Sequence, residues 1–105
     1  MWFVFPQIAG LGQSALSREF AISSQEEARA YVRHAVLGPR LLECAVILAE
    51  WRDRTAVQIL GAVDARKLHS SMTLFMRADP DQPVFRLVLD RHFDGLPDAA
   101  TDERI

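Results

Sequence analysis

The sequence contains one cysteine and no block of like charge, and each of these absences excludes a class of protein. With Cys44 alone, the 105-residue chain cannot form an internal disulfide, so a reducing, cytoplasmic setting is expected. Twelve basic and 14 acidic residues give a net charge of -2, without the basic stripe that binding to a phosphate backbone requires. DNA and RNA are therefore not expected as partners.

Glycine and proline number only five each, and no repeat or linker-like stretch divides the chain. Half of the residues are hydrophobic, which is enough to bury a core, and the length suits one domain at roughly 100 to 200 residues per domain. The apolar opening, residues 1–5, is too short for a signal peptide or a membrane span. It still has to be covered, by the core, by a second copy or by an upstream segment.

Capping and breaking signals predict an all-α fold of five to six short helices after an extended segment at residues 2–5. Ser24 begins a helix to about residue 34 through an SxxE capping box. The stretch 41–49, which follows Gly38 and Pro39, is apolar nearly all round, so we expect it to be the central, most buried helix. The remaining helices are expected after Thr55, which caps a helix ending at Gly61, after Asp64, which caps one reaching about Arg77, after Pro83 and after Asp98.

Residues 10–15, GLGQSA, fit the GxGxxA pattern of dinucleotide-binding turns, but their surroundings do not. Pro6 interrupts the segment that would be the strand, and no later segment offers a parallel partner. What remains is a helix beginning near Ser14, where the backbone N–H groups of Gly12 and Ser14 can attract phosphate or carboxylate. The alternative is that the glycines simply turn the chain.

The richest cluster of reactive groups is a polar row on the helix that follows Asp64. Asp64, Lys67 and Ser71 share one face of that helix, and Ser70 lies beside them. A lysine and hydroxyls that border an apolar face can bind an anion, with Asp64 orienting the lysine or acting as a base. The alternative is an exposed helix with an ordinary i,i+3 ion pair. No GxSxG elbow surrounds the serines, so a hydrolase nucleophile is not predicted.

Histidines and aromatic residues add no metal or cofactor motif. His34, His69 and His92 share no HxxxH or HExxH spacing, so neither a metal nor a cofactor is predicted. Trp2 and Phe5 could form an aromatic wall for a flat ligand, although aromatic clusters in small domains are more often part of the core.

Six segments in order resemble one bacterial family, that of domain of unknown function 1810, and the likeness covers essentially the whole chain. The resemblance implies a compact multihelical fold and a cytoplasmic protein of undetermined activity. Members are sometimes labelled calpastatin, a label that does not suit a short apolar chain. The segments are WFVFPQI at 2–8, GLG at 10–12, FAIS at 20–23, EARAY at 27–31, LGPRL at 37–41 and SSMTLF at 70–75.

Two departures from the family matter. Members generally carry a leading segment with a helix before WFVFPQ, so we expect a single domain over residues 1–105 that is N-terminally short and has an incomplete core. Members also tend to have a DDLKF-like stretch before the double serine, where this chain has DARKL at 64–68. The match at Asp64 and Lys67 favours a shared pocket with Ser70 and Ser71.

Two functions stay open at this point. The first is a site for an anionic, nucleotide-like metabolite; if it is catalytic, Asp64 is the general base and the chemistry is hydrolysis or group transfer. The second is an interaction module whose residues 1–5 dock on another chain, either a different protein or a second copy of this one. The ligand-binding residues of the first hypothesis are Gly12, Ser14, Lys67, Ser70, Ser71, Trp2 and Phe5.

Overall fold

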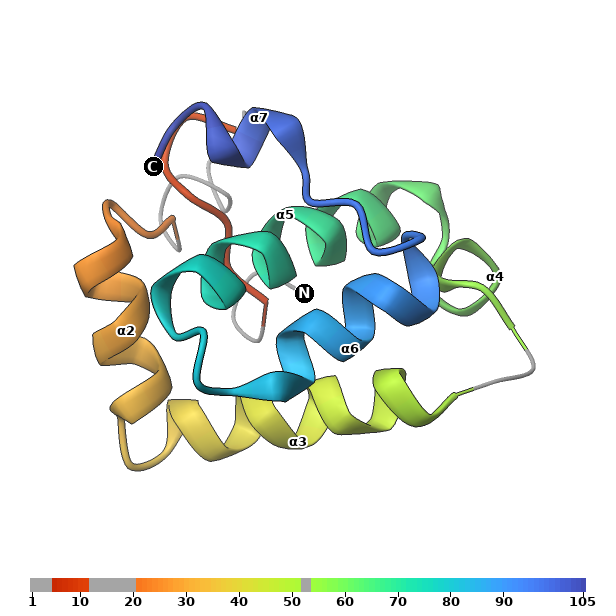
Figure 1. The fold of residues 1–105 in the computed structure, drawn as a ribbon, viewed down its shortest axis with the longest axis horizontal. Coiled ribbons are helices and arrows are strands. Elements are labelled where there is room, and N and C mark those ends of the chain that lie inside the picture. The colour runs from red at the N-terminus through yellow and green to blue at the C-terminus, as the bar shows by residue number, and fades with distance from the viewer. Residues whose placement is uncertain (1–4, 12–20, 52–53) are drawn as a thin grey trace.

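The computed structural model describes residues 5–11, 21–51 and 54–105 and is all-helical there, as predicted (Figure 1). An isolated parallel bridge between Ile8 and Ile22 is the only strand-like pairing within these ranges. The helices, in chain order, are α2 (Gln25–Arg33), α3 (Leu37–Glu50), α4 (Ala56–Leu60), α5 (Ala62–Ala78), α6 (Pro83–His92) and α7 (Ala99–Asp102).

The central helix is α5, so the prediction that residues 41–49 form the hub is wrong. Helix α5 runs through the middle of the molecule and contacts α2, α4, α6 and α7 (Figure 1). Every residue from Ser70 to Met76 is buried. In α3, Val46 and Ile47 are 41% and 51% exposed. An apolar surface is buried only where neighbouring elements surround it, and α3 packs mainly on α2 and α6.

The predicted N-caps of α2 and α4 are confirmed. The Ser24 hydroxyl accepts a hydrogen bond from the Glu27 backbone N–H at 3.1 Å. The Glu27 carboxylate accepts hydrogen bonds from the Ser23 backbone N–H, at 3.0 Å, and from the Ser23 hydroxyl. The hydrogen bond from the Ser23 hydroxyl lowers the pKa of Glu27. At α4, Thr55 and Gln58 form a reciprocal capping box.

Helix α5 begins three residues earlier than predicted, so Asp64 lies in its first turn and is not its N-cap. Gly61 ends α4 and precedes α5 with a φ of 86°, in the left-handed region that favours glycine. Its position allows the chain to start a new helix at once. Asp64 still benefits from the helix N-terminus, where a carboxylate is electrostatically favoured.

The turn between α2 and α3 depends on Gly38 and His34. A Cβ on Gly38 would lie 1.9 Å from the Val32 carbonyl oxygen, so this position admits only glycine. The His34 Nδ1 atom accepts hydrogen bonds from the backbone N–H groups of Val36 and Leu37, each at 3.1 Å. The imidazole therefore caps the start of α3 from outside the helix.

The end of α3 is held by side chains from α6. The His92 Nε2 atom lies 2.6 Å from the Leu48 carbonyl oxygen, and the Arg91 Nε atom donates to the Trp51 carbonyl oxygen at 3.0 Å. The Leu48 carbonyl also accepts from the Trp51 backbone N–H at 3.3 Å, whereas the Trp51 carbonyl lies beyond the last helical residue of α3. The hydrogen bonds from His92 and Arg91 hold α6 beside α3 in addition to the apolar packing between the two helices.

The described part of the N-terminal segment belongs to the core. Phe5 and Ile8 are 5% and 2% exposed. Backbone hydrogen bonds join Ala9 to Ile22 at 2.7 Å and Ile22 to Gln7 at 2.8 Å. The protein's own core therefore covers Phe5, which is available neither as a docking residue nor as the open aromatic wall predicted from the sequence. The remainder of the predicted docking segment, residues 1–4, lies outside the described residues.

Candidate functional site

Ser70, predicted as a ligand-binding residue, is used to hold α7 in place. Its hydroxyl lies 3.0 Å from the Arg66 carbonyl oxygen and 3.2 Å from the Asp98 carboxylate. The same carboxylate oxygen accepts from the Thr101 backbone N–H at 3.1 Å and from the Thr101 hydroxyl at 2.6 Å. Asp98 thus caps α7, as predicted, and joins it to α5. The Ser70 hydroxyl is committed to the fold.

Ser71, the next residue, differs from Ser70 in that its hydroxyl has no hydrogen-bond partner. It is 0% exposed, and its hydroxyl oxygen is buried without a hydrogen-bond partner. On the same helix, Ser70 and Thr73 donate to the carbonyl one turn back, at 3.0 Å and 2.8 Å. Ser71 makes no such bond. A buried hydroxyl left unpaired costs about 1–3 kcal/mol, so this group is unusual in the helix.

Lys67 and Asp64 lie on the same face of α5 as Ser71. The Lys67 ammonium is 3.9 Å from the Asp64 carboxylate, and their side chains are 15% and 41% exposed. Asp64 and Lys67 are in contact, and Ser71 follows Lys67 by one turn on the same helix. The low exposure of Lys67 does not suit the alternative of a fully solvated helix face. Instead, a largely buried cation stands one turn from an unpaired hydroxyl.

Three of the predicted ligand-binding residues, Trp2, Gly12 and Ser14, lie outside the described residues. Gly10 has a φ of 97°, and a Cβ there would lie 2.8 Å from the Arg104 guanidinium. Gly10, the first glycine of the GxGxxA pattern, therefore sits at a turn that favours glycine, while the two interpretations of Gly12 and Ser14 remain predictions.

Tyr31, which the sequence places on the apolar stripe of the helix after Ser24, packs against the core from α2. Its ring packs on Phe75 with centroids 5.5 Å apart, and Phe75 follows Ser71 by one turn on the same face of α5. Burial raises the pKa of the Tyr31 phenol, the positive charge of Arg40 opposes that rise, and Cys44 adds to it.

The histidines serve as structural groups. His69 stacks on Phe93 with centroids 4.2 Å apart and an interplanar angle of 3°, and its Nε2 atom lies 2.6 Å from the Leu96 carbonyl oxygen. His34 and His92 hold the two ends of α3. Within the described ranges no group of three or more histidine, cysteine or acidic side chains is placed to hold a metal ion.

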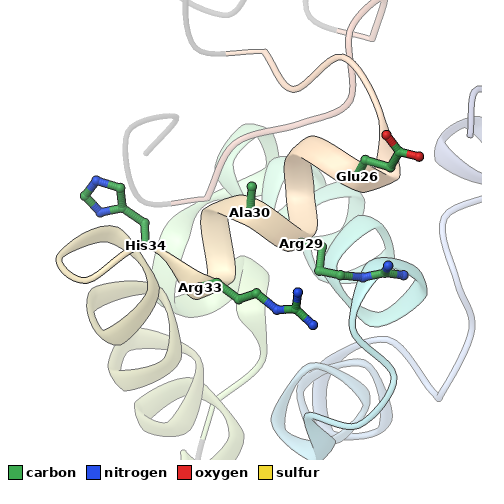
Figure 2. Close-up of a pocket in the computed structure, with 5 residues that line it drawn as sticks. All are labelled: Glu26, Arg29, Ala30, Arg33 and His34. Atoms are coloured by element: carbon green, nitrogen blue, oxygen red, sulfur yellow. The ribbon is translucent and has the colours of Figure 1, made fainter.

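A second polar region lies on the outer face of α2, as a shallow hollow of about 350 Å³ (Figure 2). The Arg29 and Arg33 side chains point to the same side of the helix, while His34 points away from them (Figure 2). The Arg29 Nε atom donates to the Ala78 carbonyl oxygen at 2.9 Å, so its guanidinium satisfies the end of α5. This hollow is lined only by residues of α2 and its C-cap, namely Glu26, Arg29, Ala30, Arg33 and His34.

The described residues form a compact all-helical protein whose central helix, α5, carries Asp64, Lys67 and Ser71. The chain belongs to the family of proteins of unknown function DUF1810, because the family model matches residues 1–105. A search of curated proteins gave no match. Across the described residues, no helix has the length and apolar character needed to cross a membrane.

A solved structure shares the fold closely. The chain is 45% identical to the conserved hypothetical protein Rv1873 from Mycobacterium tuberculosis, with a TM-score of 0.94. The match covers 97% of this chain and 73% of that chain. The comparisons therefore establish the family and the fold.

Proposed function

We propose that this protein binds a small anionic metabolite at the polar row of α5, with Lys67 and Ser71 as its contacts. The Ser71 hydroxyl is the single observation that carries the proposal. It is fully buried and unpaired, while its neighbours on the same helix are satisfied. Alanine would fill the same position without leaving an unpaired polar group. An oxygen of a bound molecule would supply the missing hydrogen-bond partner.

Lys67 supplies the charge that an anion needs. Its side chain is only 15% exposed, so its attraction for an anion is less screened than that of a surface lysine. Asp64, 3.9 Å away, orients the ammonium from the exposed side of the row. Asp64 is also the carboxylate placed to act as general base if the bound molecule is hydrolysed or transfers a group.

Binding at Ser71 requires an opening motion, because the residue is 0% exposed. A ligand first meets Lys67 at the partly exposed edge of the row and reaches Ser71 as the surrounding chain opens. The apparent affinity is then reduced by the fraction of molecules that are open. Weak to moderate affinity is therefore expected.

Calorimetric titration with inorganic phosphate, ribose 5-phosphate and adenosine monophosphate tests the proposal. At least one of these should bind the wild-type protein, and Lys67→Ala and Ser71→Ala should each weaken binding by about tenfold or more. Ser70→Ala is the matched control, because it removes the adjacent buried hydroxyl but leaves Lys67 and Ser71 in place. Binding that is unchanged in Lys67→Ala and Ser71→Ala, or no binding of any probe, would contradict the proposal.

A second candidate function, self-association, is favoured by apolar side chains left open on α3 and α6. Val46, Ile47, Trp51 and Leu87 are between 41% and 52% exposed. Of the segment 1–5 predicted for such contacts only Phe5 is described, and it lies in the core, so the proposal is argued from α3 and α6. Light scattering across a dilution series tests this function, with Ile47→Glu expected to favour the monomer. A monomeric mass at every concentration would contradict self-association.

A further inference from the structure

Helices α3 and α6 share an outer surface that is both apolar and charged. They lie side by side (Figure 1), and contacts from Arg91 and His92 to the end of α3 hold their C-terminal ends together. A hollow of about 350 Å³ opens between them, lined by Ala49, Glu50, Leu87, Asp90 and Arg91. The exposed side chains of the two helices therefore belong to one continuous surface, the α3–α6 face.

On α3, the outward side is apolar and acidic. Its exposed positions recur at three- and four-residue spacing, namely Glu43, Val46, Ile47 and Glu50. Glu43 and Glu50 take no part in the ion pairs formed among the described residues. Burial raises the pKa of the Tyr31 phenol and the positive charge of Arg40 opposes that rise, so Arg40 lies toward α2. The exposed apolar side chains of α3 are therefore flanked by two carboxylates.

On α6, the outward side carries more positive than negative charge. Its exposed side chains beyond Pro83 are Arg86, Leu87, Asp90 and Arg91. Asp90 pairs with Arg86 at 3.1 Å within the helix. Two arginines thus stand against one aspartate, and the outward side of α6 is opposite in charge to that of α3.

These charges select how two copies of the chain can meet through the α3–α6 face. A dimer with two-fold symmetry uses the same surface on both copies. Packing of α3 on the partner's α3 sets glutamates against glutamates, and packing of α6 on the partner's α6 sets arginines against arginines. Packing of α3 on the partner's α6 sets carboxylates against guanidinium groups, and the symmetry makes this contact twice. Like charges that face each other disfavour the first two arrangements.

The positions of the charges along the two helices also match. The Leu48 carbonyl oxygen and the His92 ring are in contact, which fixes the level of one helix against the other. Glu43 precedes Leu48 by five residues and Arg86 precedes His92 by six, so both lie at about the same level along the face. A two-fold axis that runs along and between the helices keeps these levels and brings Glu43 of each copy over Arg86 of the other.

We infer that the α3–α6 face binds a second copy of this chain, with α3 of each copy lying along α6 of the other. This inference rests on the second candidate function, self-association. Val46 and Leu87, which are 41% and 52% exposed, lie at the apolar centre of each contact and leave water on association. The flanking carboxylates and guanidinium groups set the orientation.

The size of the face suits a reversible dimer. Helix α3 has 14 residues and α6 has 10, so the face is about 20 Å long and two helices wide. Two such faces bury on the order of 1,000 Å² in total, less than the roughly 1,600 Å² of a standard stable interface. A dissociation constant in the micromolar range is therefore expected.

Sedimentation equilibrium of charge-exchanged variants tests the inference. Glu43→Lys should raise the dissociation constant of the dimer about tenfold or more, because it sets a lysine against the arginines of the partner's α6. Arg86→Glu should do the same, because its carboxylate then meets the glutamates of the partner's α3. An equimolar mixture of these two variants should associate nearly as well as the wild-type protein, since each altered helix then meets a complementary one.

Glu103→Lys is the matched control, because it makes the same charge change at an exposed position after α7. It should leave the dissociation constant unchanged. A wild-type protein that stays monomeric at every concentration would overturn both self-association and this inference. Self-association that Glu43→Lys strengthens or leaves unchanged would keep the second function and overturn the pairing of α3 with the partner's α6. A mixture that associates no better than its two components would also overturn this pairing.

Discussion

The Ser70 hydroxyl lies 3.2 Å from the Asp98 carboxylate, and this contact joins the last helix of the chain to the most buried one. The backbone of Asp98 takes part as well, because its N–H donates to the Thr73 hydroxyl at 2.8 Å. Helix α7 has only four residues and could not persist alone. Its position therefore depends on these polar contacts with α5.

Asp98→Ala should lower the free energy of unfolding by about 2 kcal/mol, since it removes a helix cap and leaves the buried Ser70 and Thr101 hydroxyls without their shared acceptor. Urea-induced unfolding measures the loss. Asp102→Ala is the matched control: Asp102 pairs with Arg77 at the surface at 3.0 Å, a contact worth less than about 1 kcal/mol. Equal losses in the two variants would contradict the role given to Asp98.

His92→Ala should destabilise the protein by about 1–2 kcal/mol, because it leaves the Leu48 carbonyl oxygen with only its contact to the Trp51 backbone N–H and opens space beside it. Arg91→Ala removes the more exposed contact to Trp51 and should cost less than His92→Ala. Amide hydrogen exchange provides the specific measurement. In His92→Ala, faster exchange should appear first at the C-terminal turn of α3, and an increase confined to α2 would oppose this assignment.

The start of α2 should respond to acid. The Ser23 hydrogen bonds lower the pKa of Glu27 from its ordinary value of 4.5. A carboxyl group whose pKa is lowered by folding adds stability above its unfolded pKa and loses it as the pH falls through the folded value. Stability should therefore decrease below about pH 4.5, and Glu27→Gln should reduce this component of the decrease. Thermal unfolding between about pH 7 and pH 3.5 shows whether it does, with Glu26→Gln as the control.

Local signals in the sequence were sufficient for most of the helix boundaries. Ser24, Thr55 and Asp98 cap the helices for which they were predicted, because a side-chain acceptor at the N-terminus acts within three residues. Gly61 was likewise identified as the end of α4. The start of α5 was missed because this glycine also precedes the next helix, and Asp64 appeared to be a better cap.

The central helix could not be identified from apolar residues alone. Residues 70–76 carry no charge but include two serines and a threonine, which weaken the hydrophobic signal. Ser70 and Thr73 satisfy their hydroxyls on the carbonyl one turn back and can therefore be buried. In the polar row, the sequence predicted that Asp64, Lys67 and Ser71 share one face of the helix. It could not predict that the Ser70 hydroxyl contacts Asp98 of α7 while the Ser71 hydroxyl has no partner, because α7 is distant in the sequence.

Amide chemical-shift mapping during titration with ribose 5-phosphate is the most direct test of the claim that the Lys67–Ser71 face of α5 binds an anion. The account predicts saturable shifts centred on Lys67 and Ser71, which are absent in Ser71→Ala and retained in Ser70→Ala. Shifts that map instead to Arg29 and Arg33 on the outer face of α2, or no saturable shifts at all, would contradict it.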